Sequence, residues 1–452
     1  MEKIVIIGSN HSGLAAARFL NLSDSNYEVI LIDKKSEISY LECGTSLFIK
    51  GEVSNLEDLF YQNRMTLNSE IKKLFLETEV DKIDIQNKKI SCVKKDGTRF
   101  SQEYDKVILA TGSKQIMLDI PGNNLANIFS IKNFPNAKEI FKALDDSTIK
   151  KVGIIGAGYI GVEIAEAIRK RGKEVYLFDV ADRVLSTYYD RSFSDKVEEI
   201  LSKNGIHLCL SESPKKYLGR KKIEKIVTTS GTQYSMDMVV QAIGFLSNSP
   251  IGEKELLRDV SGAYLTNEYQ QTNIKDIYAI GDCATTFFTS INRSSVDFSI
   301  SNALRTAYIA TQHINNQDFT PSGSQFTNGF SIFNYNFYAA GLNLKTARLL
   351  SESIDYIEIE DFIRPAFLRK NSRVKLRISF EKNTKRIVGV QLCSQEDLSG
   401  LLSMFSLAIE EQITLDKLKM LDYLFHPSFS QPYNFILKAV TGLNIETLIV
   451  TK

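Results

Sequence analysis

Short apolar runs alternate with helical patterns twice in the first half of the chain. Residues 4–33 have the pattern of a buried strand, a glycine-containing turn, a helix and a second strand that ends in Asp33. Residues 152–179 repeat this order, and the apolar positions of the helix expected at about 160–171 fall on one face. Short apolar strands that alternate with helices form parallel sheets covered on both faces. The pattern therefore predicts an α/β fold with two separate βαβ units.

The pattern changes after about residue 326. Apolar and polar residues alternate over 374–380, and after a polar turn a second strand is expected at 387–392, which predicts a hairpin. An apolar helical segment follows at about 401–409. Strands followed by a helix predict a C-terminal α+β unit, and the Thr-Pro-Ser-Gly-Ser segment at 320–324 is the expected linker to it.

The bulk composition narrows the function classes. At roughly 150 residues per domain, 452 residues predict about three domains, and 43% hydrophobic residues can supply a core for each. The formal net charge of +1 argues against nucleic acid or an anionic membrane as the main partner. No apolar run approaches the roughly 18 residues that cross a bilayer, and the N-terminus lacks the pattern of a secretion signal. With five cysteines and no CxxC pair, we expect a reducing, cytoplasmic location.

The more regular nucleotide motif is Gly-Ala-Gly-Tyr-Ile-Gly at 156–161, placed between a strand and a helix. Its first glycine permits a tight turn, its second lets a pyrophosphate approach the backbone, and its third allows close packing of the helix. Asp179 stands 18 residues beyond Gly161, where a carboxylate accepts hydrogen bonds from ribose hydroxyls and repels a 2′-phosphate. The motif predicts NADH binding rather than NADPH binding, the alternative being a glycine turn without a ligand.

The first motif, Gly-Ser-Asn-His-Ser-Gly at 8–13, is less regular because Asn10 replaces the middle glycine. Asparagine tolerates unusual backbone angles, so the turn can survive. Asp33 lies 20 residues after Gly13 and supplies the second ribose acceptor. This motif also predicts a nucleotide site, and a turn without a ligand is again the alternative.

Two later strands that run into glycine turns connect these motifs to a known superfamily. Ala-Thr-Gly at 110–112 and Gly-Asp-Cys-Ala-Thr at 281–285 stand on either side of the second nucleotide unit. This order resembles the pyridine nucleotide-disulphide oxidoreductase superfamily. The resemblance implies FAD at the first site, with Asp282 binding the ribityl chain. It further implies an FAD-binding domain split over 1–113 and 244–322, an NADH-binding domain at 114–243, and a C-terminal dimerisation domain at 323–452.

Cys43, in Ser-Tyr-Leu-Glu-Cys-Gly, is the expected third redox centre. Disulphide reductases of the superfamily carry a second cysteine five residues later, where this chain has Phe48, so a dithiol relay between neighbours is excluded. A single thiol can still cycle through a sulfenic acid or a mixed disulphide. The start of a following helix would help hold it as a thiolate. A core cysteine without chemistry is the alternative.

The segment around Cys43 and the position of His11 resemble the single-cysteine branch of the superfamily. This branch comprises NADH peroxidases, water-forming NADH oxidases and CoA-disulphide reductases. The resemblance implies that Cys43 and His11 are catalytic. As a hypothesis, NADH reduces FAD, O2 adds to give a flavin hydroperoxide, and Cys43 reduces the released peroxide through a sulfenic acid with help from His11. For His11 the alternative is a helix-capping residue. The resemblance also implies a homodimer in which the C-terminal domain reaches the other subunit's flavin.

The resemblance also implies the cofactor contacts. The ring of Tyr159 is expected to cover the flavin until nicotinamide displaces it, and Glu163 is expected close to the nicotinamide. No metal is expected. The FAD contacts are Gly8, Asn10, His11, Gly13, Asp33, Lys34, Cys43, Val80, Ala110, Thr111, Gly112, Lys132, Asp282 and Ala284. The NADH contacts are Gly156, Gly158, Tyr159, Ile160, Gly161, Glu163, Asp179, Tyr188 and Gly244.

Several residues bear on the choice within the branch. Tyr433 stands where peroxidases tend to have tryptophan, which favours an oxidase, and His11 argues against a CoA-disulphide reductase. O2 is thus the expected acceptor and peroxide the main alternative. Ile300 is bulkier than its usual counterpart near the flavin, and His426 is displaced from the oxidases' histidine and is expected to be structural. An NADH-binding flavoprotein sensor without turnover is the non-enzymatic alternative.

Overall fold

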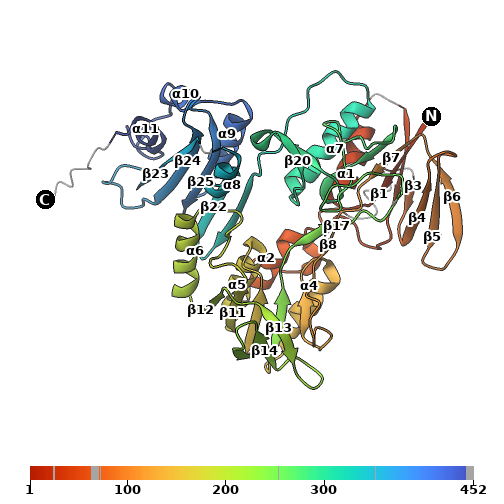
Figure 1. Ribbon diagram of the computed structural model, residues 1–452, viewed down its shortest axis with the longest axis horizontal. Coiled ribbons are helices and arrows are strands. Elements are labelled where there is room, and N and C mark those ends of the chain that lie inside the picture. The colour runs from red at the N-terminus through yellow and green to blue at the C-terminus, as the bar shows by residue number, and fades with distance from the viewer. Residues whose placement is uncertain (24–25, 63–70, 72, 253, 352, 444–452) are drawn as a thin grey trace.

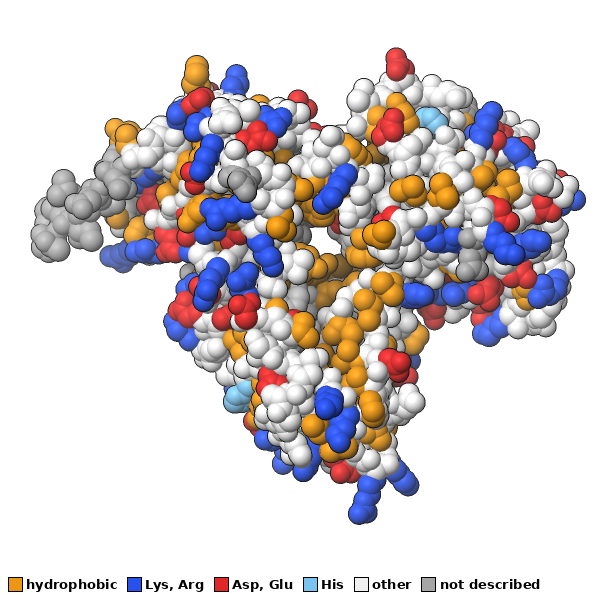
Figure 2. Space-filling view, viewed as in Figure 1, with side chains coloured by type: hydrophobic (Ala, Val, Ile, Leu, Met, Phe, Trp, Pro, Cys, Tyr) orange, Lys and Arg blue, Asp and Glu red, His pale blue; other side chains and the backbone are white. Residues whose placement is uncertain are grey.

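The computed structural model describes residues 1–23, 26–62, 71, 73–252, 254–351 and 353–443. The chain forms three lobes, and Figure 1 shows the N-terminal and C-terminal lobes above a lobe made of the middle of the chain. Figure 2 shows a hollow where the three lobes meet, with hydrophobic side chains around it. No helix in the described part of the chain combines the length and the apolarity that a membrane crossing needs.

The first lobe is built on a parallel sheet with the order β18-β7-β1-β2-β3. Apolar residues on one face of the sheet pack against two helices, and those on the other face pack against an antiparallel three-stranded sheet. Because β18 follows the whole second lobe in sequence, the chain returns to complete its first sheet. The strands of the main sheet are β1 (Glu2–Ile7), β2 (Tyr27–Ile32), β3 (Lys73–Phe75), β7 (Lys106–Leu109) and β18 (Ile277–Ala279); the covering elements are α1 (His11–Asn21), α7 (Ile300–Ile314), β4 (Thr78–Asp84), β5 (Lys89–Lys94) and β6 (Arg99–Glu103).

The second lobe repeats this plan with a parallel sheet in the order β12-β11-β10-β16-β9. The helix expected at about 160–171 is α5, and its apolar stripe is buried in the core. The prediction of two Rossmann-like units is confirmed. The elements are β9 (Ile128–Ser130), β10 (Lys151–Ile155), β11 (Glu174–Asp179), β12 (Ile206–Leu210), β16 (Met238–Gln241), α4 (Phe134–Asp145), α5 (Tyr159–Lys170), α6 (Arg191–Lys203) and the antiparallel β13 (Pro214–Leu218), β14 (Lys225–Thr228) and β15 (Gln233–Ser235).

The C-terminal lobe is an antiparallel sheet in the order β21-β22-β25-β24-β23 with helices packed on it. The predicted hairpin is present, because Leu376 pairs with Leu392 across two neighbouring strands. The expected linker at 320–324 has neither helix nor strand, and the Ser324 N–H donates to a carbonyl of the first lobe at 2.7 Å. The elements are β21 (Asn328–Ile332), β22 (Tyr335–Gly341), β23 (Ile354–Phe362), β24 (Arg373–Glu381), β25 (Ile387–Ser394), α8 (Leu344–Leu350), α9 (Ser399–Glu410), α10 (Leu415–Lys419) and α11 (Phe435–Thr441).

The two connections between the first and second lobes run side by side. They form an antiparallel pair, β8 (Ser113–Gln115) with β17 (Phe245–Ser247). A second small pair, β19 (Thr286–Phe288) with β20 (Arg293–Ser295), lies between β18 and α7 in sequence. The helix that follows Cys43, α2 (Thr45–Lys50), packs against α5.

A buried ion pair joins all three lobes. The Lys50 ammonium on α2 lies 2.6 Å from the Glu166 carboxylate on α5, and the two side chains are only 5% and 2% exposed. The other Glu166 oxygen accepts the Phe333 N–H of the C-terminal lobe at 2.8 Å and lies 2.9 Å from Lys170. Removing one partner of such a pair leaves an uncompensated charge in a poorly solvated place.

We therefore expect Lys50→Met to lower the free energy of unfolding by about 3 kcal/mol in a urea titration of the purified protein. The matched control is Lys203→Met, which removes an exposed lysine paired with Glu199 on one helix, and its effect should stay below about 1 kcal/mol. Equal small losses in both variants would show that the buried pair does not hold the lobes together.

Candidate active site

Both predicted glycine turns have a geometry that requires glycine. Gly8 has φ +113° and Gly156 has φ +104°, and an added Cβ would lie 2.1 Å and 2.4 Å from a backbone oxygen of a neighbouring strand end. A Cβ on Gly13 or Gly161 would lie 1.9 Å from the carbonyl oxygen of the first glycine of its own motif. These third glycines let each helix pack on its turn, and neither lines the larger cavity beside its own motif.

The two predicted ribose acceptors occupy equivalent places. Asp33 Oδ2 accepts the Ser9 N–H at 2.6 Å, and Asp179 Oδ2 accepts the Ala157 N–H at 2.6 Å. Each carboxylate thus holds the residue that follows the first glycine, and each lines the adjacent cavity. A carboxylate oxygen accepts more than one hydrogen bond, so both still have capacity for a ligand. Their role toward a ribose remains a prediction.

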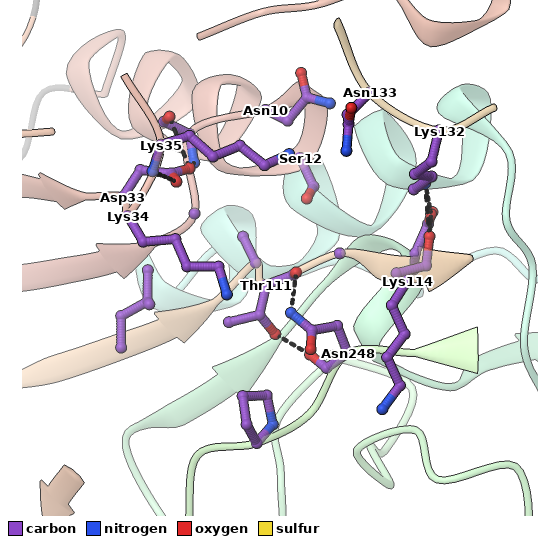
Figure 3. Close-up of a pocket in the computed structure, with 18 of the residues that line it drawn as sticks. Asn10, Ser12, Asp33, Lys34, Lys35, Thr111, Lys114, Lys132, Asn133 and Asn248 are labelled. Carbon is purple, nitrogen blue, oxygen red and sulfur yellow. Dashed lines mark hydrogen bonds and ion pairs between the residues drawn. The ribbon is translucent and has the colours of Figure 1, made fainter. Parts of the chain in front are cut away.

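A cavity of about 540 Å³ runs along the end of the first parallel sheet (Figure 3). Asn10 Oδ1 and His11 Nε2 are buried beside it and find no hydrogen-bond partner among the described residues. Buried polar atoms are normally satisfied, so this cavity fits a polar ligand such as FAD. Ala284, a predicted contact, is buried in the core instead. The predicted contacts that do line the cavity are Gly8, Asn10, His11, Asp33, Lys34, Val80, Ala110, Thr111, Gly112, Lys132 and Asp282.

The sequence analysis missed several residues of this cavity. Two of them accept hydrogen bonds from the predicted Lys132: Glu42 at 2.9 Å and Ser113 at 2.8 Å. Glu42 is the residue before Cys43, so its carboxylate lies next to the thiol in sequence. Ser113 could have been found because it follows the predicted Gly112. Asn248 donates to the Thr111 carbonyl at 3.0 Å, as Figure 3 shows, and no sequence signal marks it.

A second cavity, of about 500 Å³, lies at the corresponding end of the second sheet. The Tyr159 and Tyr188 rings meet edge to face in its wall, with centroids 5.1 Å apart. Thr187, Glu212 and Phe298 also line it and were not predicted. The predicted NADH contacts that line it are Gly156, Gly158, Tyr159, Ile160, Asp179, Tyr188 and Gly244.

A third cavity, of about 100 Å³, brings Cys43, His11 and Glu163 together. It shares His11 and Lys132 with the first cavity, and Tyr159 and Phe298 with the second. The thiol therefore lies where the two larger cavities meet. Glu163, predicted beside the nicotinamide, lines this cavity rather than the second one, and so does the bulky Ile300.

The surroundings of Cys43 favour the protonated thiol. Cys43 lies in a 3-10 turn, Glu42–Gly44, that leads into α2, so the helix does begin where expected. However, although Cys43 is exposed to the cavity, desolvation by the surrounding protein and then the carboxylates of Glu163 and Glu42 raise the pKa of the thiol to about 11, against a lowering by Lys132. These surroundings favour the neutral thiol over the thiolate expected at the helix start, so attack by the sulfur would require a base.

His11 is the first residue of α1, and the N-cap position belongs to Asn10. Burial lowers the pKa of the His11 imidazole to about 4, so the ring is neutral at pH 7. Its Nδ1 lies 2.9 Å from the Tyr61 hydroxyl and its ring stacks on the Tyr61 ring. Tyr61, which the sequence analysis missed, therefore fixes the orientation of the imidazole.

Glu163 is the group of this cavity that titrates near neutral pH. Burial raises the pKa of its carboxyl to about 7, with Lys50 lowering it and Glu166 raising it. A group with a pKa near the working pH can both accept and return a proton. Glu163 is thus suited to exchange a proton within the cavity that holds Cys43.

The remaining predicted positions lie outside the three cavities. His426 is exposed in a turn, and its Nδ1 accepts the Ser428 N–H at 3.2 Å. Tyr433 is half exposed on the same C-terminal segment. In the described ranges, no group of three or more His, Cys, Asp or Glu residues has the arrangement of a metal site.

The raised pKa of Glu163 makes a stability prediction. Its folded-state pKa of about 7 lies above its ordinary 4.5, so its contribution is fully present below pH 4.5 and is lost as the pH rises through 7. Glu163→Gln removes this dependence. As the pH rises from 4.5 to 8, the original chain should therefore lose about 3 kcal/mol of its free energy of unfolding relative to the variant. Urea titrations at both pH values measure this difference, and parallel pH profiles would contradict the buried location.

Comparison with known proteins places the chain in a family. It is 37% identical to a protein named NADH oxidase from Lactococcus lactis subsp. cremoris (strain MG1363), over 98% of this chain and 99% of the relative. It is also 37% identical to an NADH oxidase from Streptococcus pyogenes serotype M6, with the same coverage. The structure of a water-forming NADH oxidase from Lactobacillus brevis bound to NADH is similar, with a TM-score of 0.94, 27% identity and 98% of both chains covered. The sequence pattern of the pyridine nucleotide-disulphide oxidoreductase family matches residues 2–313. The chain belongs to the pyridine nucleotide-disulphide oxidoreductase family.

Proposed function

We propose that the chain is an NADH oxidase that uses FAD and reduces O2 to water with Cys43 as its second redox centre. The observation that carries the proposal is the small cavity in which Cys43, His11 and Glu163 meet between the two nucleotide cavities. The names of the Lactococcus lactis and Streptococcus pyogenes relatives, and the water-forming enzyme from Lactobacillus brevis, support the same activity. The chain is therefore an oxidoreductase.

The two larger cavities hold the cofactors in this proposal. FAD is held by the residues of the first cavity, in the domain formed by 1–113 and 244–322. NADH is held by the residues of the second cavity, in the domain formed by 114–243. FAD, when bound, takes a hydride from NADH and passes the electrons to O2, which yields hydrogen peroxide. Asp179 faces the second cavity at the end of β11, where its charge favours NADH over NADPH.

Peroxide reduction then takes place at Cys43. Glu163 accepts the thiol proton, and the sulfur attacks one peroxide oxygen while the O–O bond breaks. The departing hydroxide takes up the proton, which leaves a Cys43 sulfenic acid and one water. The neutral His11 ring, oriented by Tyr61, directs Nε2 to hydrogen-bond the reacting oxygen. A second NADH and one proton reduce the sulfenic acid to the thiol and a second water.

The sum is two NADH, two protons and one O2 giving two NAD+ and two waters. The same residues would serve an NADH peroxidase if O2 does not react, because only the peroxide step uses Cys43. The Ile300 side chain in the wall of the small cavity narrows the space for O2, so oxygen turnover is the step to test.

The substitution Cys43→Ser separates these activities. Without the thiol, peroxide is released rather than reduced, so NADH consumed per O2 should fall from two to one and hydrogen peroxide should accumulate. An oxygen electrode with and without catalase, together with NADH absorbance, measures both quantities. Cys209→Ser is the control, since this thiol lies on β12 outside the small cavity.

Two results would contradict the proposal. Unchanged water production by Cys43→Ser would remove the sulfenic acid step. Fast turnover with added peroxide but none with O2 in the unmodified enzyme would identify an NADH peroxidase instead, and fast turnover only with a CoA disulphide would identify a reductase of that class.

We also propose that residues 323–452 make a homodimer. Large apolar side chains stay exposed along the segment before α11, with Met420 84%, Leu424 73% and Phe429 63% accessible. Monomeric proteins rarely expose apolar patches of this density, and such patches mark association surfaces. A second copy of the chain is the occupant that the family resemblance implies.

A charged residue in this surface should dissociate the dimer. Leu424→Glu is expected to shift the mass measured by light scattering after gel filtration from that of two chains toward that of one. Val260→Glu is the control, because Val260 is fully exposed on the first lobe and should leave the mass unchanged. An unmodified chain that elutes as a monomer would contradict the proposal.

A further inference from the structure

The loop between β11 and α6 connects the second cavity to the C-terminal lobe. Thr187 and Tyr188 in this loop line the second cavity, and Tyr188 packs on Tyr159. The next polar residue, Asp190, is buried against the C-terminal sheet. One short stretch of chain thus touches the proposed NADH site at one end and another lobe at the other.

The inner end of the loop is strained and tied to the glycine turn. Leu185 has φ +54°, in the left-handed region that non-glycine residues rarely adopt. Its N–H donates to the Ala157 carbonyl at 2.9 Å, and its own carbonyl accepts the N–H of Tyr188 at 2.9 Å. A backbone in this region persists only where the surrounding structure holds it.

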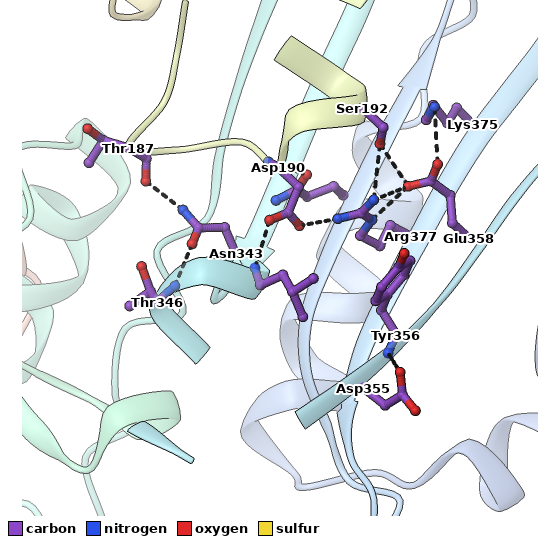
Figure 4. A network of polar contacts seen from close by, with 12 residues as sticks. Thr187, Asp190, Ser192, Asn343, Thr346, Asp355, Tyr356, Glu358, Lys375 and Arg377 are labelled. Atoms are coloured by element: carbon purple, nitrogen blue, oxygen red, sulfur yellow. Dashed lines mark hydrogen bonds and ion pairs between the residues drawn. The ribbon is translucent and has the colours of Figure 1, made fainter. Parts of the chain in front are cut away.

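The outer end is held by the C-terminal lobe, as Figure 4 shows. Asp190 lies 3.0 Å from the Arg377 guanidinium on β24 and accepts the Leu344 N–H at the start of α8 at 2.9 Å. The Asn343 side-chain amide donates to the Thr187 carbonyl at 2.7 Å. These contacts from the C-terminal lobe therefore act on the segment that carries Tyr188.

Arg377 is itself held rigidly. Its guanidinium lies 2.6 Å from Glu358 and over the Tyr356 ring at 4.3 Å, and it donates to Ser192 at 3.2 Å. Buried ion pairs add little net stability compared with apolar packing, but they fix one geometry of the groups they join. This cluster is therefore better explained by the position it imposes on the loop than by the stability it adds.

We propose that Arg377 and Asn343 are positioning residues for NADH, which they serve by holding the strained loop so that Thr187 and Tyr188 form the wall of the second cavity. The inference rests on the proposed use of NADH. It makes the C-terminal lobe, none of whose described residues lines that cavity, a determinant of coenzyme affinity.

Asn343→Asp is the sharpest test, because Asn343 has two separable roles. Its Oδ1 caps α8 by accepting the Thr346 N–H at 2.8 Å, and aspartate keeps this cap. Its amide N–H₂ holds Thr187, and aspartate cannot donate there. In the FAD-loaded enzyme we expect the KM for NADH to rise about tenfold, in the range for residues that act through a network, with kcat within about twofold.

Arg377→Met should raise the KM similarly, and Arg377→Lys should restore part of the loss. Arg386→Met is the matched control, because Arg386 pairs with Glu381 in the same sheet without touching the loop, and it should leave the KM unchanged. Calorimetric titration of the oxidised, FAD-loaded enzyme with NAD+ measures binding without turnover, and the dissociation constant should rise in parallel.

Asn343→Asp with the original KM and NAD+ affinity would overturn the inference, even if Arg377→Met fails to fold. An equal rise in KM for Arg386→Met would also overturn it, because the effect would then be general to the lobe. Both results leave the proposed function intact when the unmodified enzyme oxidises NADH. If the unmodified enzyme neither oxidises NADH nor binds NAD+, the proposed function fails first.

Discussion

Desolvation of three titratable groups in one small space is the constraint on which the site depends. Cys43, His11 and Glu163 line the same cavity, and burial is the largest cause of the pKa shift of each. Burial favours the neutral form of each group, so it raises the pKa of the thiol and of the carboxyl group and lowers the pKa of the imidazole. The thiol and the imidazole are therefore neutral at pH 7, and the carboxyl group is the one that can exchange a proton. The proposed peroxide reduction therefore starts from a neutral thiol and a carboxyl group that can take its proton, rather than from a preformed thiolate.

The fold creates this space by joining two similar units end to end. In each unit a glycine turn at the end of a parallel strand leads into a helix, and ligands of such sheets bind at the carboxyl ends of the strands. The crossing strands β8 and β17 place the two ends side by side. The helix after Cys43 packs on α5, which starts at the second glycine turn. The thiol is thus positioned by both nucleotide units at once.

The sequence predicted the two glycine turns, the elements beside them and a minority of the residues that line the two larger cavities, because these depend on local patterns. Glycine spacing located both turns, and hydrophobic periodicity located the helices. Contacts between distant segments carry no such signal, so Tyr61 beside His11 and the pairing of Lys50 with Glu166 were missed. Gly161 makes the close helix packing that the motif predicts for its third glycine, and Gly13 does the same in the first motif. The pKa of Cys43 is raised first by desolvation and then by the carboxylate of Glu163, which comes from another lobe, and neither cause has a local signal in the sequence.

The described residues of the C-terminal lobe act on the second cavity without lining it. A left-handed Leu185 is unfavourable in isolation, and the surrounding structure must compensate for it. The compensation comes from two directions: the glycine turn binds the inner end of the loop, and Asp190 with Arg377 binds the outer end. Releasing either end would let the backbone relax toward a common conformation and carry Tyr188 away from Tyr159. The strain therefore links the geometry of the second cavity to the docking of a lobe that lies outside it.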